Sequence, residues 1–134
     1  NDKNTPIKSQ RIKWEPFNIY EINHYVKMGY TVFVNITADW CVTCKINKTL
    51  ILNQEPVLSA LRKQNIIAME ADWTFPNLEV TNYLALFNRY GIPFNSVYGP
   101  KKTEGIVLPE LLSQKSVMKA LMLAKGKPNL NKIK

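Results

Sequence analysis

The chain has 134 residues and 46% hydrophobic content, enough for one compact domain whose folding does not depend on disulfides. Its net charge of +8 would suit a nucleic-acid or membrane-surface protein, but the ends carry most of it. Residues 1–13 hold four of the 18 basic side chains and one of the 10 acids, and residues 125–134 hold four more basic ones, which leaves an almost neutral body of ten basic and nine acidic residues. No stretch approaches the ~20 apolar residues of a membrane span, and no signal-peptide pattern is present.

This charge distribution predicts three parts. Residues 1–13 form a flexible basic linker, residues 14–125 form the folded domain, and residues 126–134 form a basic tail. Attraction of the tails to an anionic membrane surface remains an alternative. Because the chain does not begin with Met, we expect it to be an excised domain or a processed product.

The first half of the chain predicts helices and strands in alternation. Apolar residues at helical spacing predict a helix over 17–28 that Gly29 ends. A β-branched run predicts a central strand over 31–37. Beyond it, after two cysteines, we expect helices over 45–52 and 56–63 and a strand over 65–70.

The second half begins with a turn-rich stretch over 72–77 and a predicted helix over 78–90 that ends near Gly91. Strand-like runs over 94–98 and 105–108 flank the turn at 99–102 and predict a hairpin, and a closing amphipathic helix is expected over 113–124. The order βαβαββα after an N-terminal extension predicts an α/β layer fold in which the hairpin adds antiparallel pairing.

Cys41 and Cys44 are the two cysteines of the chain, and they stand where the strand over 31–37 gives way to a helix. A thiol at the first turn of a helix faces unpaired backbone N–H groups and the positive end of the helix dipole, which favour the thiolate. Cys41 is therefore a candidate nucleophile. Cys44 lies one turn further on, with Val42 and Thr43 between, and can resolve a mixed disulfide formed at Cys41.

Other uses of the two cysteines fit less well. Structural zinc needs four Cys or His ligands, whereas this chain adds only the distant His24 to its two cysteines. Covalent haem attachment needs His after the second cysteine, where the chain has Lys45. A purely structural disulfide stays open, although so short a loop contributes little chain-entropy stabilisation. We expect no metal and no organic cofactor, only the redox-active cysteine pair.

Four segments in order resemble one known family. ADWCVTCK at 38–45, DWT at 72–74, GIP at 91–93 and VLPELL at 107–112 are together similar to the C-terminal thioredoxin-like domain of the bacterial thiol:disulfide interchange proteins of the DsbD/ScsB family. The resemblance runs from about Trp14 to Lys125. It implies a thioredoxin-like fold, a central mixed sheet flanked by helices. It also implies a periplasmic domain, attached to a membrane-embedded electron carrier, that passes electrons to a partner protein.

The same resemblance implies roles for several residues. Cys41 would be the exposed attacking cysteine and Cys44 the buried resolving one. Pro93 would be the cis-proline beside the disulfide, with Ile92 offering backbone hydrogen bonds to a docked partner. An ordinary proline at the start of a strand is the alternative for Pro93.

Two positions depart from the family pattern. Asn35 occupies the place of a buried carboxylate on the central strand, and Lys48 the place of an acid after the second cysteine. We therefore expect the usual proton acceptors to be absent. Lys45 and Lys48 would then stabilise the Cys41 thiolate and make the couple more oxidising, unless both point into solvent.

The residues just before the motif also have two interpretations. Asp39 either influences Cys41 or caps the helix, and Trp40 either frames the surface that meets a partner or packs inside. We favour Trp40 on the partner surface, because exposed aromatic side chains beside a reactive group commonly anchor interfaces.

The sequence thus predicts a protein-disulfide reductase. It would be monomeric as an isolated domain and would relay electrons from a membrane carrier domain of the same parent protein to a periplasmic acceptor, without nucleic acid or small-molecule cofactor. A thiol oxidase or isomerase differs from it in redox potential and not in fold. A non-catalytic thioredoxin-like binding module and an intermolecular zinc clip remain as alternatives of other classes.

Overall fold

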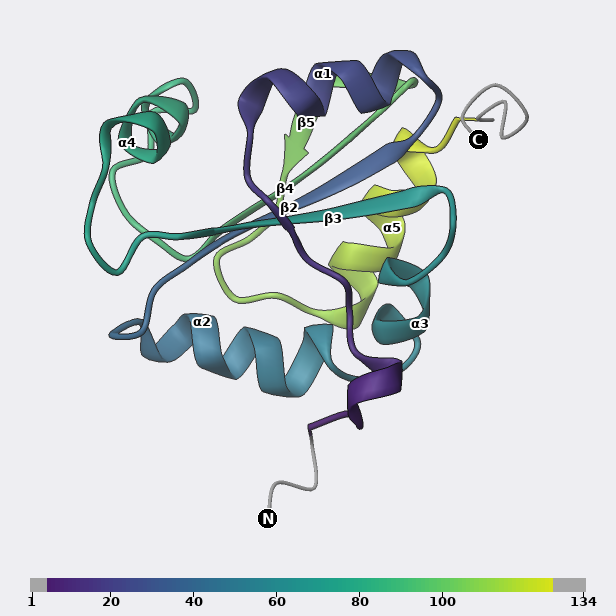
Figure 1. Ribbon diagram of the computed structural model, residues 1–134, viewed down its shortest axis with the longest axis horizontal. Coiled ribbons are helices and arrows are strands. Elements are labelled where there is room, and N and C mark those ends of the chain that lie inside the picture. The colour runs from purple at the N-terminus through teal and green to yellow at the C-terminus, as the bar shows by residue number, and fades with distance from the viewer. Residues whose placement is uncertain (1–4, 127–134) are drawn as a thin grey trace.

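A computed structural model describes residues 5–126, and they form a five-stranded sheet between two layers of helices (Figure 1). The strands are β1 (Glu15–Pro16), β2 (Thr31–Thr37), β3 (Ile66–Asp72), β4 (Phe94–Gly99) and β5 (Lys102–Val107). The helices are α1 (Ile19–Lys27), α2 (Val42–Asn47), α3 (Val57–Leu61), α4 (Leu78–Ala85) and α5 (Gln114–Ala124), with a 3₁₀ turn at Lys8–Gln10 and a π-helical turn at Lys48–Leu52.

The sheet has the order β1-β3-β2-β4-β5 and is mixed, as predicted. β3 runs parallel to both β1 and β2, whereas β4 is antiparallel to β2 and to β5. The predicted central strand has the bounds expected for it, and its seven residues pair with the whole of β3. The predicted hairpin is also confirmed, although β5 begins immediately after the turn and not at residue 105.

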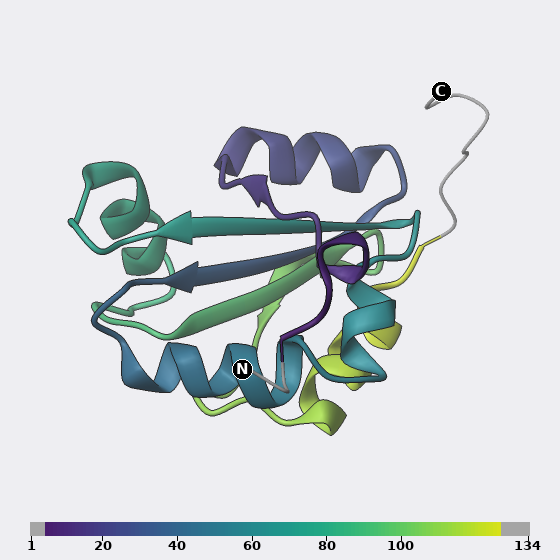
Figure 2. The same ribbon diagram turned by 60° about the horizontal axis from the view of Figure 1, so that its bottom comes forward.

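Each face of the sheet carries its own hydrophobic core. Figure 2 shows α1 and α4 on one side of the sheet and α2, α3 and α5 on the other. The core under α1 and α4 takes alternate residues of β2, namely Val32, Val34 and Ile36. Phe33, from the positions between them, packs with α3 and α5 on the other face. This alternation matters for the site, because Asn35 shares its face with Phe33.

Local signals in the sequence account for several helix ends. The side chains of Asn18, Asn77 and Ser113 accept hydrogen bonds from the first turns of α1, α4 and α5. Gly29 has φ 97° and follows α1, a conformation that suits glycine. The predicted helix over 78–90 was too long, since α4 ends at Ala85 and Asn88 adopts a left-handed conformation with φ 57°.

The two predicted tails fall partly outside the described residues. Residues 1–4 of the expected linker and residues 127–134 of the expected basic tail are among those not described. Within the linker, Lys8–Gln10 form the 3₁₀ turn, and Ile12 is 7% exposed in the core beneath α3 and α5.

Candidate functional site

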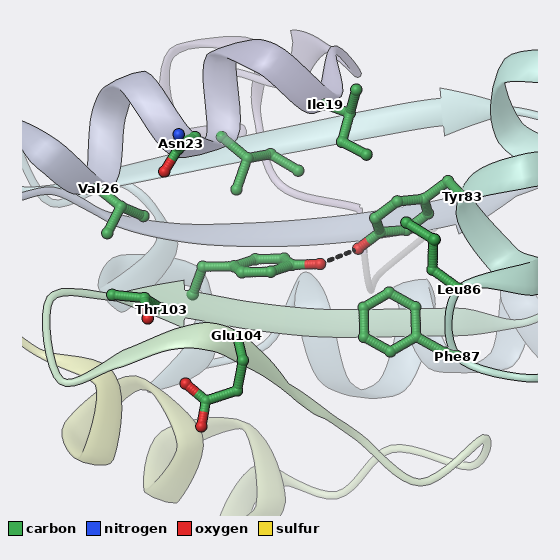
Figure 3. Close-up of a pocket in the computed structure, with 10 residues that line it drawn as sticks. Ile19, Asn23, Val26, Tyr83, Leu86, Phe87, Thr103 and Glu104 are labelled. Atoms are coloured by element: carbon green, nitrogen blue, oxygen red, sulfur yellow. Dashed lines mark hydrogen bonds between the residues drawn. The ribbon is translucent and has the colours of Figure 1, made fainter.

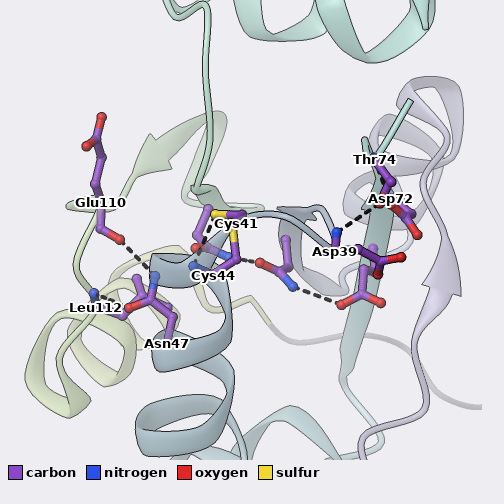
Figure 4. The surroundings of a disulfide bond; sticks show 11 residues. Asp39, Cys41, Cys44, Asn47, Asp72, Thr74, Glu110 and Leu112 are labelled. Carbon is purple, nitrogen blue, oxygen red and sulfur yellow. Dashed lines mark hydrogen bonds between the residues drawn. A yellow bond between two sulfur atoms is a disulfide. The ribbon is translucent and has the colours of Figure 1, made fainter. Parts of the chain in front are cut away.

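The two cysteines form a disulfide at the start of α2, with their Cα atoms 5.2 Å apart. Cys41 is the N-cap residue of α2, and its Sγ accepts a hydrogen bond of 3.2 Å from the backbone N–H of Cys44. Figure 4 shows the pair at this end of the helix, between Asp39 and Asn47. The sulfur of Cys41 therefore meets a helical N–H donor, which is the environment that stabilises a thiolate there once the disulfide is reduced.

The expectation that Cys41 is exposed is wrong for the disulfide form. Both cysteines are 5% exposed and pack with Ala38 and the side chain of Ile92. The exposed groups of this region are their neighbours, since Trp40 is 57% and Val42 69% exposed. The disulfide holds the Cys41 side chain inward against this small apolar cluster, which the sequence alone did not indicate.

The loop that leads into the disulfide is tied to the end of β3. The backbone N–H of Asp39 donates to the Thr74 hydroxyl over 2.8 Å, and the Trp40 indole donates to the Thr74 carbonyl oxygen over 3.1 Å. Asp72 in turn accepts from the backbone N–H and the hydroxyl of Thr74, and these donors lower the pKa of its carboxyl below 3.8. Asp39 does not cap α2, because the sulfur of Cys41 fills that place.

Pro93 follows a cis peptide bond, as the family resemblance implied. Pro93 immediately precedes β4, and Ile92 is the partly buried residue that packs against the cysteine cluster. Ile92 is therefore placed beside the disulfide, and the buried Pro93 follows it directly, although both are more than 45 positions away from the cysteines in the sequence.

A row of polar side chains crosses three strands on the face that carries α2. Asn35 of β2 lies between Glu70 of β3 and Asn95 of β4 in the strand register. Its Nδ2 donates to Glu70 Oε2 over 2.9 Å, and its Oδ1 accepts from Asn95 Nδ2 over 2.8 Å. The Nζ of Lys48 completes the row with a 2.9 Å ion pair to the same Glu70 oxygen.

This row corrects the expectation that an acid is absent. Glu70 brings a carboxylate, 23% exposed, to the amide of Asn35, so the carboxylate comes from the neighbouring strand. Lys48 is engaged as well, since it pairs with Glu70 and its Nζ lies 5.6 Å from the centroid of the Trp14 ring. Lys45 is exposed and Thr43 half-buried.

With this geometry in place, comparison with known proteins decides the family. A family profile described as thioredoxin-like matches residues 26–100, which is more than half of the chain. The chain belongs to the thioredoxin-like family. The match contains β2, the cysteine pair, Pro93 and β4, so the predicted fold class is confirmed.

A curated relative extends the resemblance found in the sequence. The thiol:disulfide interchange protein DsbD of Pseudomonas fluorescens is 32% identical over 76 residues, which cover 57% of this chain. The match spans only 13% of the length of that relative. The suspected similarity to the DsbD family is therefore confirmed, while the activities of the whole relative concern a much longer protein.

Solved structures share the fold. The C-terminal domain of Neisseria meningitidis DsbD in its oxidised form superposes with a TM-score of 0.62 at 19% identity, covering 80% of this chain and 92% of that domain. A thioredoxin from Thermus thermophilus gives a TM-score of 0.60 at 16% identity and covers 81% of this chain and 85% of its own. A thioredoxin-like domain with a Cys-x-x-Cys disulfide at the start of a helix is the arrangement of a thiol:disulfide oxidoreductase.

Sequence reasoning missed three polar residues of the site region. Glu70 and Asn95 are polar positions inside strand-like runs, and only the strand register shows that they flank Asn35. Asn47 is 2% exposed, donates to the Glu110 carbonyl oxygen and accepts from the Leu112 N–H, and so ties α2 to the segment before α5. An uncharged polar residue on the inner face of a predicted helix is the signal that could have revealed it.

A cavity of about 380 Å³ lies on the other face of the sheet, between α1, α4 and the β4–β5 hairpin (Figure 3). Tyr83 and Tyr98 meet there through their hydroxyl groups, and burial raises the pKa of both phenols. The cysteine pair does not line this cavity. Over residues 5–126, no helix is long and apolar enough to cross a membrane, and no three His, Cys, Asp or Glu side chains gather as a metal site would require.

Proposed function

We propose that this domain is an electron relay that reduces disulfides of other proteins through Cys41 and Cys44. Electrons would come from a membrane-embedded domain of the same parent protein and pass to a periplasmic acceptor protein. The observation that carries the proposal is the disulfide at the N-terminus of α2, packed against Ile92 of the cis Ile92–Pro93 pair in a thioredoxin-like domain that is similar to part of DsbD.

The chemistry proceeds by two exchanges at sulfur. The Cys41 thiolate attacks a partner disulfide, an S–S bond forms between the two proteins, and the other partner sulfur leaves and takes up a proton. Cys44 then loses its proton and attacks Cys41 Sγ, so the second partner sulfur leaves as a thiol. Two electrons have passed to the partner, and the Cys41–Cys44 disulfide awaits reduction by a dithiol of the carrier domain.

Exposed apolar side chains around the disulfide support a protein as the substrate. Trp40 and Val42 are more than half exposed, and Phe75, next to the Thr74 that binds Trp40, is 85% exposed. Aromatic residues on a surface commonly anchor protein interfaces. In this proposal Trp40, Ile92 and Pro93 contact the partner, while Asp39, Val42, Thr43 and Lys45 surround the reacting sulfurs.

The reduction potential of the pair tests the direction of electron flow. The purified domain is equilibrated with defined thiol–disulfide buffers, and its free thiols are counted. A potential near the thioredoxin value of about −270 mV supports a reductant relay. A potential approaching about −120 mV would instead identify a donor of disulfides, the oxidase alternative.

Trapping of the mixed disulfide tests catalysis itself. Cys44→Ser should accumulate a covalent complex with a disulfide-containing protein, since the resolving thiol is gone, and the complex should dissociate under reducing conditions. Cys41→Ser is the matched control and should trap nothing. A non-catalytic binding module predicts equal, non-covalent association of the wild type and both variants, and that result would refute the proposal.

A further inference from the structure

The polar row beneath α2 has a fixed hydrogen-bond direction that Glu70 imposes. An ionised carboxylate only accepts hydrogen bonds, so Asn35 must turn its Nδ2 toward Glu70 and its Oδ1 toward Asn95. Asn95 must then turn its own Nδ2 toward Asn35, and the same Nδ2 lies 3.3 Å from the Val34 carbonyl oxygen. Lys48, which only donates, holds the carboxylate in place from the other side.

With the amide groups turned this way, the side-chain oxygen of Asn95 at the end of the row has no hydrogen-bond donor. Asn95 is 2% exposed, and its Oδ1 is a buried side-chain oxygen without a hydrogen-bond partner within residues 5–126. An unpaired buried acceptor costs roughly 1–3 kcal/mol, so its persistence needs an explanation. The disulfide form offers this oxygen no donor.

Reduction of the disulfide creates a new hydrogen-bond donor, the thiol of Cys44, on the helix that packs over the polar row. Asn35 and Asn95 share a face of the sheet with Phe33 and Val97, two positions away on the same strands, and these pack in the core with α3 and α5. Figure 2 shows α2 on that side of the sheet. Lys48, which reaches down to this row, follows Cys44 by four residues, and its backbone N–H bonds to the Cys44 carbonyl oxygen, so the two residues lie on one face of the helix. Cys44 is 5% exposed, as expected for a side chain directed toward the sheet.

We propose that Asn95 Oδ1 accepts the hydrogen of the Cys44 thiol in the reduced protein, and that Glu70 is the positioning residue that orients the row for it. This inference deepens the proposed function, because it concerns the dithiol state of the same site. Reduction by a dithiol breaks the S–S bond and adds two electrons, while the dithiol becomes a disulfide and releases two protons. Cys44 takes up one of these protons, the other goes to solvent, and Cys41 remains the thiolate. Cys44 keeps its proton and donates it in a hydrogen bond to Asn95 Oδ1. Cys44 loses this proton when its sulfur attacks Cys41 in a mixed disulfide.

The charged groups on the segments around Cys44 are Lys45 and Lys48 on its own helical segment, Glu70 in the polar row and Asp39 in the loop before Cys41. Glu70 and Lys48 form an ion pair and offset one another. The expected effect of the row is therefore a preference for the neutral thiol, which raises the pKa of Cys44 and stabilises the reduced form.

The pKa of the Cys44 thiol, measured in a Cys41→Ser background, tests this proposal. Asn95→Leu should increase the thiolate fraction at a given pH by ~threefold to tenfold, the range expected for one hydrogen bond. In the otherwise wild-type protein, the same change should shift the equilibrium with glutathione toward the disulfide by a similar factor, and tenfold corresponds to about 30 mV. Thr31→Val, which removes another unpartnered buried oxygen from the far end of β2, is the matched control and should change neither.

Glu70→Gln tests whether Glu70 affects Cys44 by orienting the amides of the row or by its negative charge alone. If Glu70 acts through the row, its effect on the Cys44 pKa should largely vanish in the Asn95→Leu background, whereas a through-space charge effect would be additive. Glu104→Gln on β5 is the control for loss of one exposed charge.

A readout without a mutation in the row completes the test. The S–H stretching frequency of Cys44 in the Cys41→Ser protein should be lowered, as for a donating thiol. An unshifted S–H band, or an Asn95→Leu protein with an unchanged Cys44 pKa, would overturn the inference. Failure of the oxidoreductase proposal would show instead as a Cys41–Cys44 pair that does not exchange with partner disulfides, while the thiol measurements would stand.

Discussion

Asn47 joins the helix that carries the cysteines to the segment before α5, and replacing it should cost measurable stability. Asn47→Ala leaves the buried N–H of Leu112 without its 2.9 Å acceptor, at roughly 1–3 kcal/mol, and removes the 2.8 Å bond to the Glu110 carbonyl oxygen, worth about 1 kcal/mol. Alanine returns about 0.5 kcal/mol as the better helix former. The expected net loss is about 1.5–3.5 kcal/mol in the free energy of unfolding.

Urea denaturation followed by tryptophan fluorescence measures this loss. With a slope of about 2 kcal/mol per molar urea, the midpoint of Asn47→Ala should fall by about 1 M. Asn82→Ala on α4 makes the same exchange at an exposed helical position and should leave the midpoint almost unchanged. If the two variants agree within about 0.5 kcal/mol, the bonds of Asn47 do not stabilise the fold and the reasoning is refuted.

Three further predictions use the same assays. Gly99→Ala should destabilise by about 1–3 kcal/mol in urea, because a Cβ there would overlap the Ala124 carbonyl group; an unchanged midpoint would contradict the close approach. Burial and the hydrogen bond to Glu15 raise the pKa of Tyr25 from 10.0 to about 12, so this tyrosine stabilises the fold fully below pH 10 and loses that effect as the pH rises through about 12. The stability difference between wild type and Tyr25→Phe should shrink over this window, and a constant difference would exclude the linkage. Thr74→Val should raise the carboxyl pKa of Asp72 toward its usual value in an NMR titration, because the hydroxyl donor is lost. An unchanged pKa would show that the Thr74 hydroxyl does not cause the lowering.

The sequence predicted most elements because their signals are local. The β-branched run over 31–37 indicated β2 with its observed bounds, and Gly29 indicated the end of α1. β1 escaped prediction because two residues, one of them Pro16, carry no periodicity, and they pair only because β3 is beside them. The π-helical turn at Lys48–Leu52 likewise has no local signal in the sequence.

The site divides in the same way. Cys41, Cys44 and Pro93 were found from a motif and a family resemblance, which depend on the order of residues along the chain. Glu70 and Asn95 became visible only with the strand register, since each lies 35 or more positions from the Asn35 that it contacts. The absence of an acid at Asn35 therefore did not mean an absence of carboxylate, because a neighbouring strand can supply the group to the same place.

The two edge strands of the sheet do not favour pairing with a strand of another polypeptide chain. One edge ends in the two-residue β1 with Pro16, which has no N–H to offer, and the other is β5, which begins at Lys102 and carries exposed Glu104. Short, charged or proline-containing edges discourage the addition of a further strand from another chain. A protein that exchanges disulfides with extended segments of its partners would thereby release them after each reaction instead of accumulating them as mixed sheets.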